Sequence, residues 1–294
     1  MAIAVRQIHP VFVGEVSGVD LRRALAPDEV AAIEEGMDRY AVLVFHDQNI
    51  TDEQQIAFSR NFGEIENSAG GNVTRPNQKR LSHLMNDVSN LGEDHRPLER
   101  DDRRRLFNLG NQLWHSDSSF RAIPAKYSIL SGRIVVDKGG NTEFADMRAA
   151  YDALDAETKA LCETLVCEHS LMHSRGALGF PDFSEEEKAM FRPVRQALVR
   201  THPKTGRKSL YLASHAGAIV GWPVPEARAF LRDLNEEATR PENVYVHQWR
   251  PFDLVMWDNR QTMHRVRRFD ETKVRDMRRT TVAGDAPTAE QIAA

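Results

Sequence analysis

The stretch Trp114-His115-Ser116-Asp117 is the most informative part of the sequence when it is taken together with Trp257-Asp258-Asn259-Arg260-Gln261-Thr262-Met263-His264. Two imidazoles and one carboxylate are the smallest set of side chains that holds a divalent iron on one face and leaves the other face open. In a strand, residues i and i+2 project to the same side, so an extended segment at 115–117 would aim both of its ligands at one point. We therefore predict that His115, Asp117 and His264 bind iron.

Two arginines follow the second histidine at a short distance. Arg275 and Arg279 are four residues apart, so they lie on the same face of either a strand or a helix. A guanidinium binds a carboxylate through two parallel charge-assisted hydrogen bonds. Acidic residues are interspersed among these basic ones and the formal net charge of the chain is -4, which disfavours a nucleic-acid-binding patch. The pair predicts an anionic co-substrate beside the metal.

Length and composition favour a soluble protein of the cytoplasm. The 294 residues suit one large domain, and we expect a single domain over 1–294. No secretory signal or apolar stretch long enough for a membrane span is evident, so no membrane partner is expected. The two cysteines, Cys162 and Cys167, fit neither a CxxC motif nor a disulfide framework, and we expect two buried thiols.

Hydrophobic periodicity predicts more strands than helices. Strands are expected at 11–19, 41–45, 126–136, 142–146, 198–201, 209–214, 244–249 and 254–257, and helices at 27–39, 51–62, 155–167 and 224–238. This pattern favours a mainly β fold with decorating helices, built as a barrel or sandwich, over a doubly wound α/β sheet.

Residues 66–106 are rich in glycine, proline, asparagine and charge, and a loop of this length is usually functional. Because this segment directly precedes His115, we predict that it forms an active-site lid.

The order of the motifs resembles the taurine/2,4-dichlorophenoxyacetate dioxygenase family of Fe(II)- and 2-oxoglutarate-dependent oxygenases. The resemblance runs from about Val13 to Gly284 and includes the His-x-Asp pair, residues 139–146, the Trp-Asp-Asn-Arg-x-x-x-His segment and the two arginines. Residues 115–120, 146–151 and 214–216 are most similar to the phenoxyacetate branch. The resemblance implies a double-stranded β-helix (jelly-roll) core, Fe(II), and 2-oxoglutarate and O2 as co-substrates.

The resemblance also implies roles for individual residues around the iron. Thr142 and Arg275 would hold the distal carboxylate of 2-oxoglutarate. Arg279 would lie closer to the metal, and would contact both the co-substrate and the anionic group of the substrate.

Four further residues are candidates for substrate contact: Asn111, Ser118, His215 and Gly71. Asn111 matches a position that contacts substrate in the taurine members, and His215 is either a carboxylate contact or a structural histidine. The taurine members carry a His and a Tyr where an ungapped alignment places Ser68 and Gly71, which disfavours taurine and leaves room for a bulkier group.

The expected reaction is hydroxylation of an aryloxyacetate such as 2,4-dichlorophenoxyacetate at the carbon beside the ether oxygen. The product would collapse to a phenol and glyoxylate, with succinate and CO2 as co-products. Three alternatives stay open: the same chemistry on a sulfonate or alkyl sulfate, a zinc hydrolase with the same ligands, and a non-catalytic anion- or nucleic-acid-binding barrel. The family resemblance also suggests a homo-oligomer.

Overall fold

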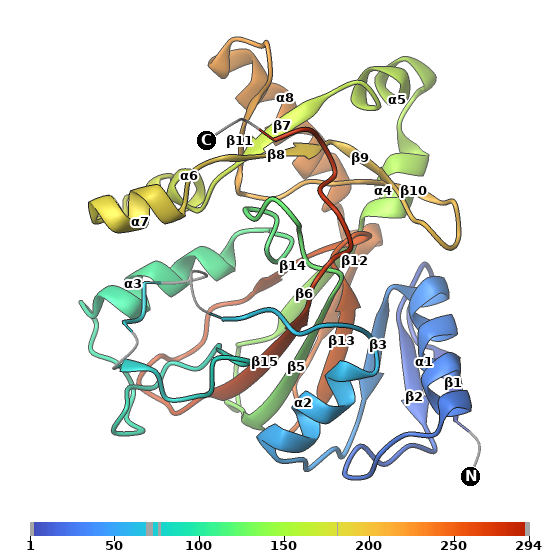
Figure 1. The fold of residues 1–294 in the computed structure, drawn as a ribbon, viewed down its shortest axis with the longest axis vertical. Helices are drawn as coiled ribbons and strands as arrows, with labels where there is room; N and C mark the ends of the chain where they lie inside the picture. Colours follow the sequence, from blue (N-terminus) through green and yellow to red (C-terminus); the bar gives the residue numbers. More distant parts are fainter. Residues whose placement is uncertain (1–2, 69–72, 76–77, 181, 292–294) are drawn as a thin grey trace.

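The computed structural model describes residues 3–68, 73–75, 78–180 and 182–291, and its centre is a seven-stranded sheet (Figure 1). The strands of this sheet lie in the order β1-β2-β3-β13-β5-β15-β4. Their bounds are β1 Ala4–Gln7, β2 Gly14–Ser17, β3 Val42–Phe45, β13 Leu254–Asp258, β5 Tyr127–Ile134, β15 Asp276–Val282 and β4 Asn86–Asp87.

The middle of the large sheet is apolar on both faces. Strands β3 and β13 are buried along their whole length, and β13 pairs antiparallel with both β3 and β5. Because side chains alternate between faces, Leu43 and Met256 pack into one cluster, whereas Val42 and Trp257 pack into another on the opposite face. Helices α1 (Pro27–Tyr40) and α2 (Asp52–Arg60) supply apolar residues to the first cluster. The predicted helix at 51–62 is confirmed, including the Thr51–Gln54 capping box.

A second sheet of three strands has the order β12-β6-β14. Its strands are β12 Val244–His247, β6 Thr142–Asp146 and β14 Thr262–Val266, and both outer strands pair antiparallel with β6. Strand β14 follows β13 after a short turn, so two consecutive strands belong to different sheets. This turn brings the end of the large sheet next to β6.

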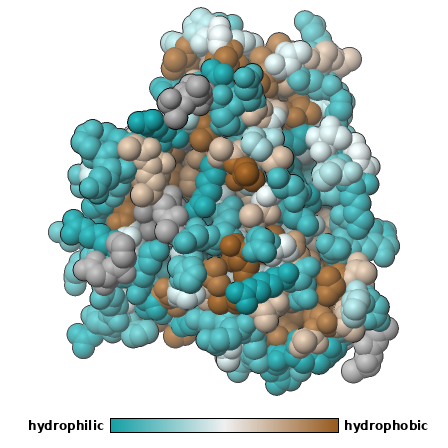
Figure 2. All heavy atoms as spheres, viewed as in Figure 1, coloured by the Kyte–Doolittle hydropathy of each residue, from teal (hydrophilic) through white to brown (hydrophobic). Residues whose placement is uncertain are grey.

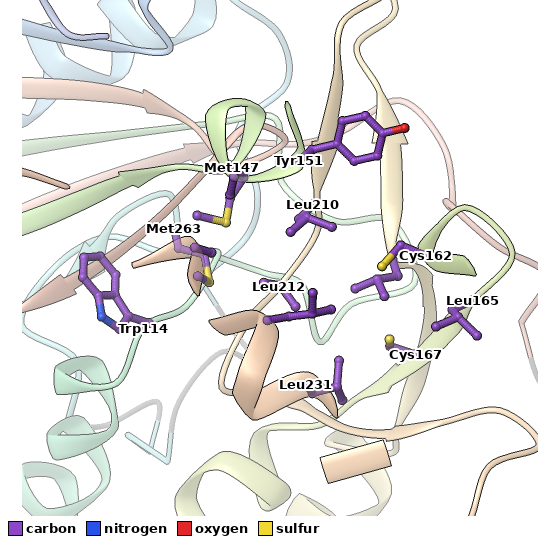
Figure 3. Packing of buried hydrophobic residues seen from close by; sticks show 14 of the residues in the cluster. Trp114, Met147, Tyr151, Cys162, Leu165, Cys167, Leu210, Leu212, Leu231 and Met263 are labelled. Carbon is purple, nitrogen blue, oxygen red and sulfur yellow. The ribbon is translucent and has the colours of Figure 1, made fainter. Parts of the chain in front are cut away.

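An outer layer of helices and short strands packs on a separate apolar cluster (Figure 3). It contains a three-stranded sheet β11-β7-β8 and the pair β10-β9. Helix α8 (Val224–Ala238) buries Ala227, Leu231, Leu234 and Ala238 on the face predicted by its periodicity. The remaining elements are α3 Arg103–Asn108, η2 Leu109–Gln112, α4 Met147–Ala153, α5 Ala156–Cys162, β7 Val166–His169, α6 Leu171–Gly176, α7 Glu185–Met190, β8 Val194–Ala197, β9 Val199–Thr201, β10 Lys208–Leu210, β11 Ala216–Ile219 and η3 Pro241–Asn243.

Two predicted elements end earlier than expected. Helix α5 ends at Cys162, and Cys167 lies on strand β7, so the prediction of one helix over 155–167 was wrong. Strand pairing of β7 with β8 and β11 overrides the helical periodicity of this segment. The strand predicted at 209–214 ends at Leu210, since β10 pairs only with the three residues of β9. Both cysteines are free and buried, as expected.

The segment predicted as a lid has partial secondary structure. Strand β4 pairs with β15, and α3 lies near its end. Arg80 forms ion pairs with Asp87 at 2.9 Å and with Asp276 of β15 at 2.8 Å. These contacts fix the described part of the segment to the edge of the large sheet.

Hydrophilic residues cover most of the face in Figure 2, with hydrophobic residues in small separate groups. Among the described residues, no helix is both long and apolar enough to cross a membrane.

A buried ion pair fixes the turn between β13 and β14. Both Asp258 oxygens accept hydrogen bonds from Arg260, at 2.9 and 2.7 Å, and Gln261 donates to one of them at 2.8 Å. Burial opposes ionisation of Asp258, but the Arg260 charge and these hydrogen bonds hold its pKa far below the usual range.

We predict that Asp258→Asn lowers the free energy of unfolding by about 3–5 kcal/mol at neutral pH, because it leaves a buried guanidinium without its counter-ion. Urea unfolding measures this loss. The exposed pair of Arg232 with Asp233 provides the control, since Asp233→Asn should change stability by about 0–1 kcal/mol. A carboxylate with a depressed pKa stabilises the fold above its unfolded pKa of about 4. The difference in stability between the unaltered protein and Asp258→Asn should therefore become smaller below that pH. An equal loss in the two variants would contradict this account.

Candidate active site

The three predicted ligands lie together and are buried. One ligand atom from each of His115, Asp117 and His264 falls within 4.8 Å of the others, and no other such group occurs among the described residues. The Nε2 atoms of His115 and His264 lie 3.9 and 3.7 Å from the Asp117 oxygens. The structure therefore brings together residues that are far apart in the sequence.

The backbone reaches this arrangement without a strand at 115–117. His264 lies on β14, and His115 forms an isolated bridge to it through two backbone hydrogen bonds of 3.0 and 2.8 Å. A turn begins at Asp117, and Ser118 has a φ of 54°. The expectation that an extended segment aligns His115 with Asp117 was wrong, because the bridge positions the histidine and the turn positions the carboxylate.

The protonation states suit a divalent metal. Burial lowers the pKa of His115, and burial together with the neighbouring His115 lowers that of His264 well below its ordinary value. Burial also opposes ionisation of Asp117, but Arg279 and the two histidines bring its pKa down to about 2. Two neutral imidazoles and one carboxylate are thus available at neutral pH, which is the state that a metal requires of its ligands.

Hydrogen bonds orient the ligands. The Leu113 carbonyl accepts from Nδ1 of His115 at 2.7 Å, which leaves Nε2 free to bind a metal. The ring of Trp257 lies 4.6 Å from that of His264 and packs against it. The buried Nδ1 of His264 has no hydrogen-bond partner among the described residues.

Asp117 is held by three side chains, two of which the sequence analysis missed. Arg279 donates to Oδ1 at 2.5 Å and Ser128 donates to Oδ2 at 2.7 Å. Asn259 accepts from the Asp117 backbone N–H at 3.1 Å and donates to Ser128 at 3.0 Å. The polar turn 258–260 after a buried strand was the signal for Asn259, whereas nothing in the sequence distinguishes Ser128 from other serines on strands.

The residues predicted for 2-oxoglutarate lie on adjacent segments. Arg275 is buried and donates to the Gly140 carbonyl at 3.2 Å, two residues before Thr142. Thr142 faces Val266 across the β6–β14 pair, so its side chain projects to the same face of the sheet as that of His264. Burial lowers the pKa of Arg275 to about 10, which leaves the guanidinium charged at neutral pH.

The residues predicted to contact substrate make hydrogen bonds to different parts of the protein. Asn111 accepts a hydrogen bond from Arg175, and the Ser118 hydroxyl donates to Glu66 at 2.7 Å. The His215 ring lies 6.0 Å from that of His115, and its Nδ1 is 2.9 Å from Ser174 Oγ. Gly71 lies outside the described residues.

A pocket with an empty volume of about 500 Å³ lies beside these groups. Its lining includes Arg275, Asn111 and five residues of the segment predicted as a lid, namely Val88, Ser89, Asn90, Leu98 and Arg105. The Asn90 side chain accepts from the Arg275 backbone N–H at 2.9 Å. The 66–106 segment thus contributes directly to the surroundings of Arg275.

Comparison with known proteins agrees with this geometry. Residues 4–281 match the family described as taurine catabolism dioxygenase TauD, TfdA family. The alpha-ketoglutarate-dependent 2,4-dichlorophenoxyacetate dioxygenase of Burkholderia sp. (strain RASC) is 46% identical over 97% of this chain and 95% of that protein. The (S)-phenoxypropionate/alpha-ketoglutarate-dioxygenase of Sphingobium herbicidovorans is 40% identical over 84% of this chain and 83% of that protein.

A solved structure is also very similar. AAD-2 in complex with Mn(II) and N-oxalylglycine has a TM-score of 0.96 and 66% identity, over 98% of this chain and 100% of that one. The resemblance inferred from the motifs is confirmed, and a mainly β fold with helices agrees with this likeness. The family favours an oxygenase over a zinc hydrolase or a non-catalytic binding protein. The chain belongs to the TauD/TfdA family of 2-oxoglutarate-dependent dioxygenases.

Proposed function

We propose that this protein is an Fe(II)/2-oxoglutarate-dependent dioxygenase that hydroxylates aryloxyacetates such as 2,4-dichlorophenoxyacetate. The observation that carries the proposal is the buried group of His115, Asp117 and His264 in one chain with the charged, buried Arg275. The names of the similar proteins support an aryloxyalkanoate as the substrate. The seven-stranded sheet and the β12-β6-β14 sheet would form the two walls of a double-stranded β-helix.

His115, Asp117 and His264 would hold Fe(II) through two imidazole nitrogens and one carboxylate oxygen. With 2-oxoglutarate and O2, the bound iron supplies the oxidation of an unactivated C–H bond, and 2-oxoglutarate becomes succinate and CO2. Arg279 and Ser128 keep the Asp117 carboxylate ionised and oriented.

Arg275 and Thr142 would bind the distal carboxylate of 2-oxoglutarate. The guanidinium carries the charge, and the hydroxyl of Thr142, which already accepts from Trp249 at 2.9 Å, can donate its own proton to the carboxylate. Segment 66–106 would cover the substrate and exclude water.

The chemistry of the substrate explains why hydroxylation releases a phenol. The carbon between the ether oxygen and the carboxylate is the favoured position, because the ether oxygen stabilises a radical there. Its hydroxylated product is a hemiacetal, which breaks down to the phenol and glyoxylate. The role of the protein is to place this carbon toward the metal.

We predict that iron-loaded protein given 2-oxoglutarate, air and 2,4-dichlorophenoxyacetate releases succinate and 2,4-dichlorophenol in equal amounts. His115→Ala should release neither, because it removes a metal ligand. Chromatography of both products provides the measurement. Taurine, an alkyl sulfate and a reaction without substrate are the controls, and succinate formed with the alkyl sulfate but not with the aryloxyacetate would contradict the proposed substrate.

We further predict that Arg275→Met raises the KM for 2-oxoglutarate about 100-fold, since hydrogen bonds to a charged group contribute about 1.5–3 kcal/mol each. Steady-state kinetics at saturating 2,4-dichlorophenoxyacetate measures this change. Arg278→Met is the matched control on the same segment, because Arg278 pairs with Asp52 and Asp276 and should leave that KM within about twofold. An equal effect of the two substitutions would refute the role of Arg275.

A further inference from the structure

Four arginines are buried among the described residues, and they fall into two classes. Arg148 and Arg260 each pair with an aspartate, at 2.9 and 2.7 Å. Arg175 and Arg275 are 5% and 4% exposed, and neither has a carboxylate within 4.0 Å in the described part of the chain. Every Asp and Glu of the sequence lies in that part.

The surroundings of the Arg175 guanidinium are polar but neutral. Its Nη1 donates to Ser174 Oγ at 3.2 Å and its Nη2 donates to Asn111 Oδ1 at 3.2 Å. Its Nε is buried without a hydrogen-bond partner among the residues that the structure describes, and the guanidinium lies 4.7 Å from the centre of the Phe107 ring. A Cβ at Gly110 would overlap the guanidinium, so glycine at this position makes room for it.

A buried cation without a counter-ion is costly, because desolvation is not offset by an ion pair. Burial lowers the pKa of Arg175 to about 10, yet the group stays charged at neutral pH. Arg275 is in the same situation and faces the proposed site for the distal carboxylate of 2-oxoglutarate. A second unpaired guanidinium indicates a second anionic ligand.

Contacts connect Arg175 to the metal centre. Ser174, which accepts from Arg175, lies 2.9 Å from Nδ1 of His215, and the His215 ring lies 6.0 Å from that of the ligand His115. Asn111, the other acceptor, lines the same pocket as Arg275. By contrast, Arg279 already donates to Asp117.

We propose that Arg175, oriented by Asn111 and Ser174, binds the carboxylate of the aryloxyalkanoate substrate. This assignment rests on the proposed function and adds the residue that selects for an anionic substrate. The oxygen of Asn111 already accepts from Arg175, so an ammonium group that approached this oxygen, such as that of taurine, would lie beside the guanidinium. The positive charge of Arg175 would also repel that group.

The test is calorimetric binding of 2,4-dichlorophenoxyacetate to protein loaded with Mn(II) and N-oxalylglycine, in which no turnover occurs. Arg175→Met should weaken binding about 100-fold, the range expected for loss of hydrogen bonds to a charged ligand. The affinities of this variant for N-oxalylglycine and for 2,4-dichlorophenoxyethanol, which lacks the carboxylate, should both stay within about twofold of those of the unaltered protein. Arg278→Met is the control, because Arg278 pairs with Asp52 and Asp276 and lies outside the segment proposed to cover the substrate.

A second variant tests the assignment while Arg175 is kept. Asn111→Asp places a carboxylate where the amide oxygen now accepts from Arg175. This carboxylate should pair with the guanidinium and weaken the binding of 2,4-dichlorophenoxyacetate about 10-fold. If Arg175→Met does not fold, this variant decides the question.

Three outcomes would overturn the proposal. The first is an affinity of either variant for 2,4-dichlorophenoxyacetate that lies within about threefold of the affinity of the unaltered protein. The second is equal weakening of the acid and the alcohol, which would show that Arg175 only packs the site. The third is no binding of the acid by the unaltered protein, which would also refute the proposed substrate.

Discussion

The buried and ionised carboxylate of Asp117 is the interaction on which the rest of the active site depends. Without the charge of Arg279, the two histidines and the Ser128 hydroxyl, burial would favour its protonated form, which is a poor metal ligand, and Asn259 holds its backbone N–H. Arg279, Ser128 and Asn259 come from β15, β5 and the β13–β14 turn. Together with His264 on β14, these residues draw the candidate metal centre from both sheets.

Two unpaired guanidiniums give the site its preference for anions. Arg275 and Arg175 are buried without carboxylate partners, whereas Arg148 and Arg260 carry theirs within the fold. Charges interact strongly in a buried site of low dielectric constant, so two buried cations favour ligands that carry negative charge.

The sequence predicted the three residues that the structure brings together as a group able to hold a metal ion, because a His-x-Asp pair, a downstream histidine and two spaced arginines have few other uses together. It also predicted helix α8 and the capping box at Thr51, where local chemistry decides the structure. It failed where tertiary contacts decide: the turn at Asp117 depends on the bridge to His264, and Cys167 joins a strand because β8 and β11 pair with it. Arg175 could not be distinguished from other arginines, since only the fold shows that no acid lies near it.

The most direct test of this account is a crystal structure of the protein with Mn(II), N-oxalylglycine and 2,4-dichlorophenoxyacetate. The account predicts Mn(II) bound by His115, Asp117 and His264, the distal carboxylate of N-oxalylglycine on Arg275, and the carboxylate of the aryloxyacetate on Arg175. A metal bound by other residues, or an aryloxyacetate whose carboxylate lies away from both Arg175 and Asn111, would contradict it.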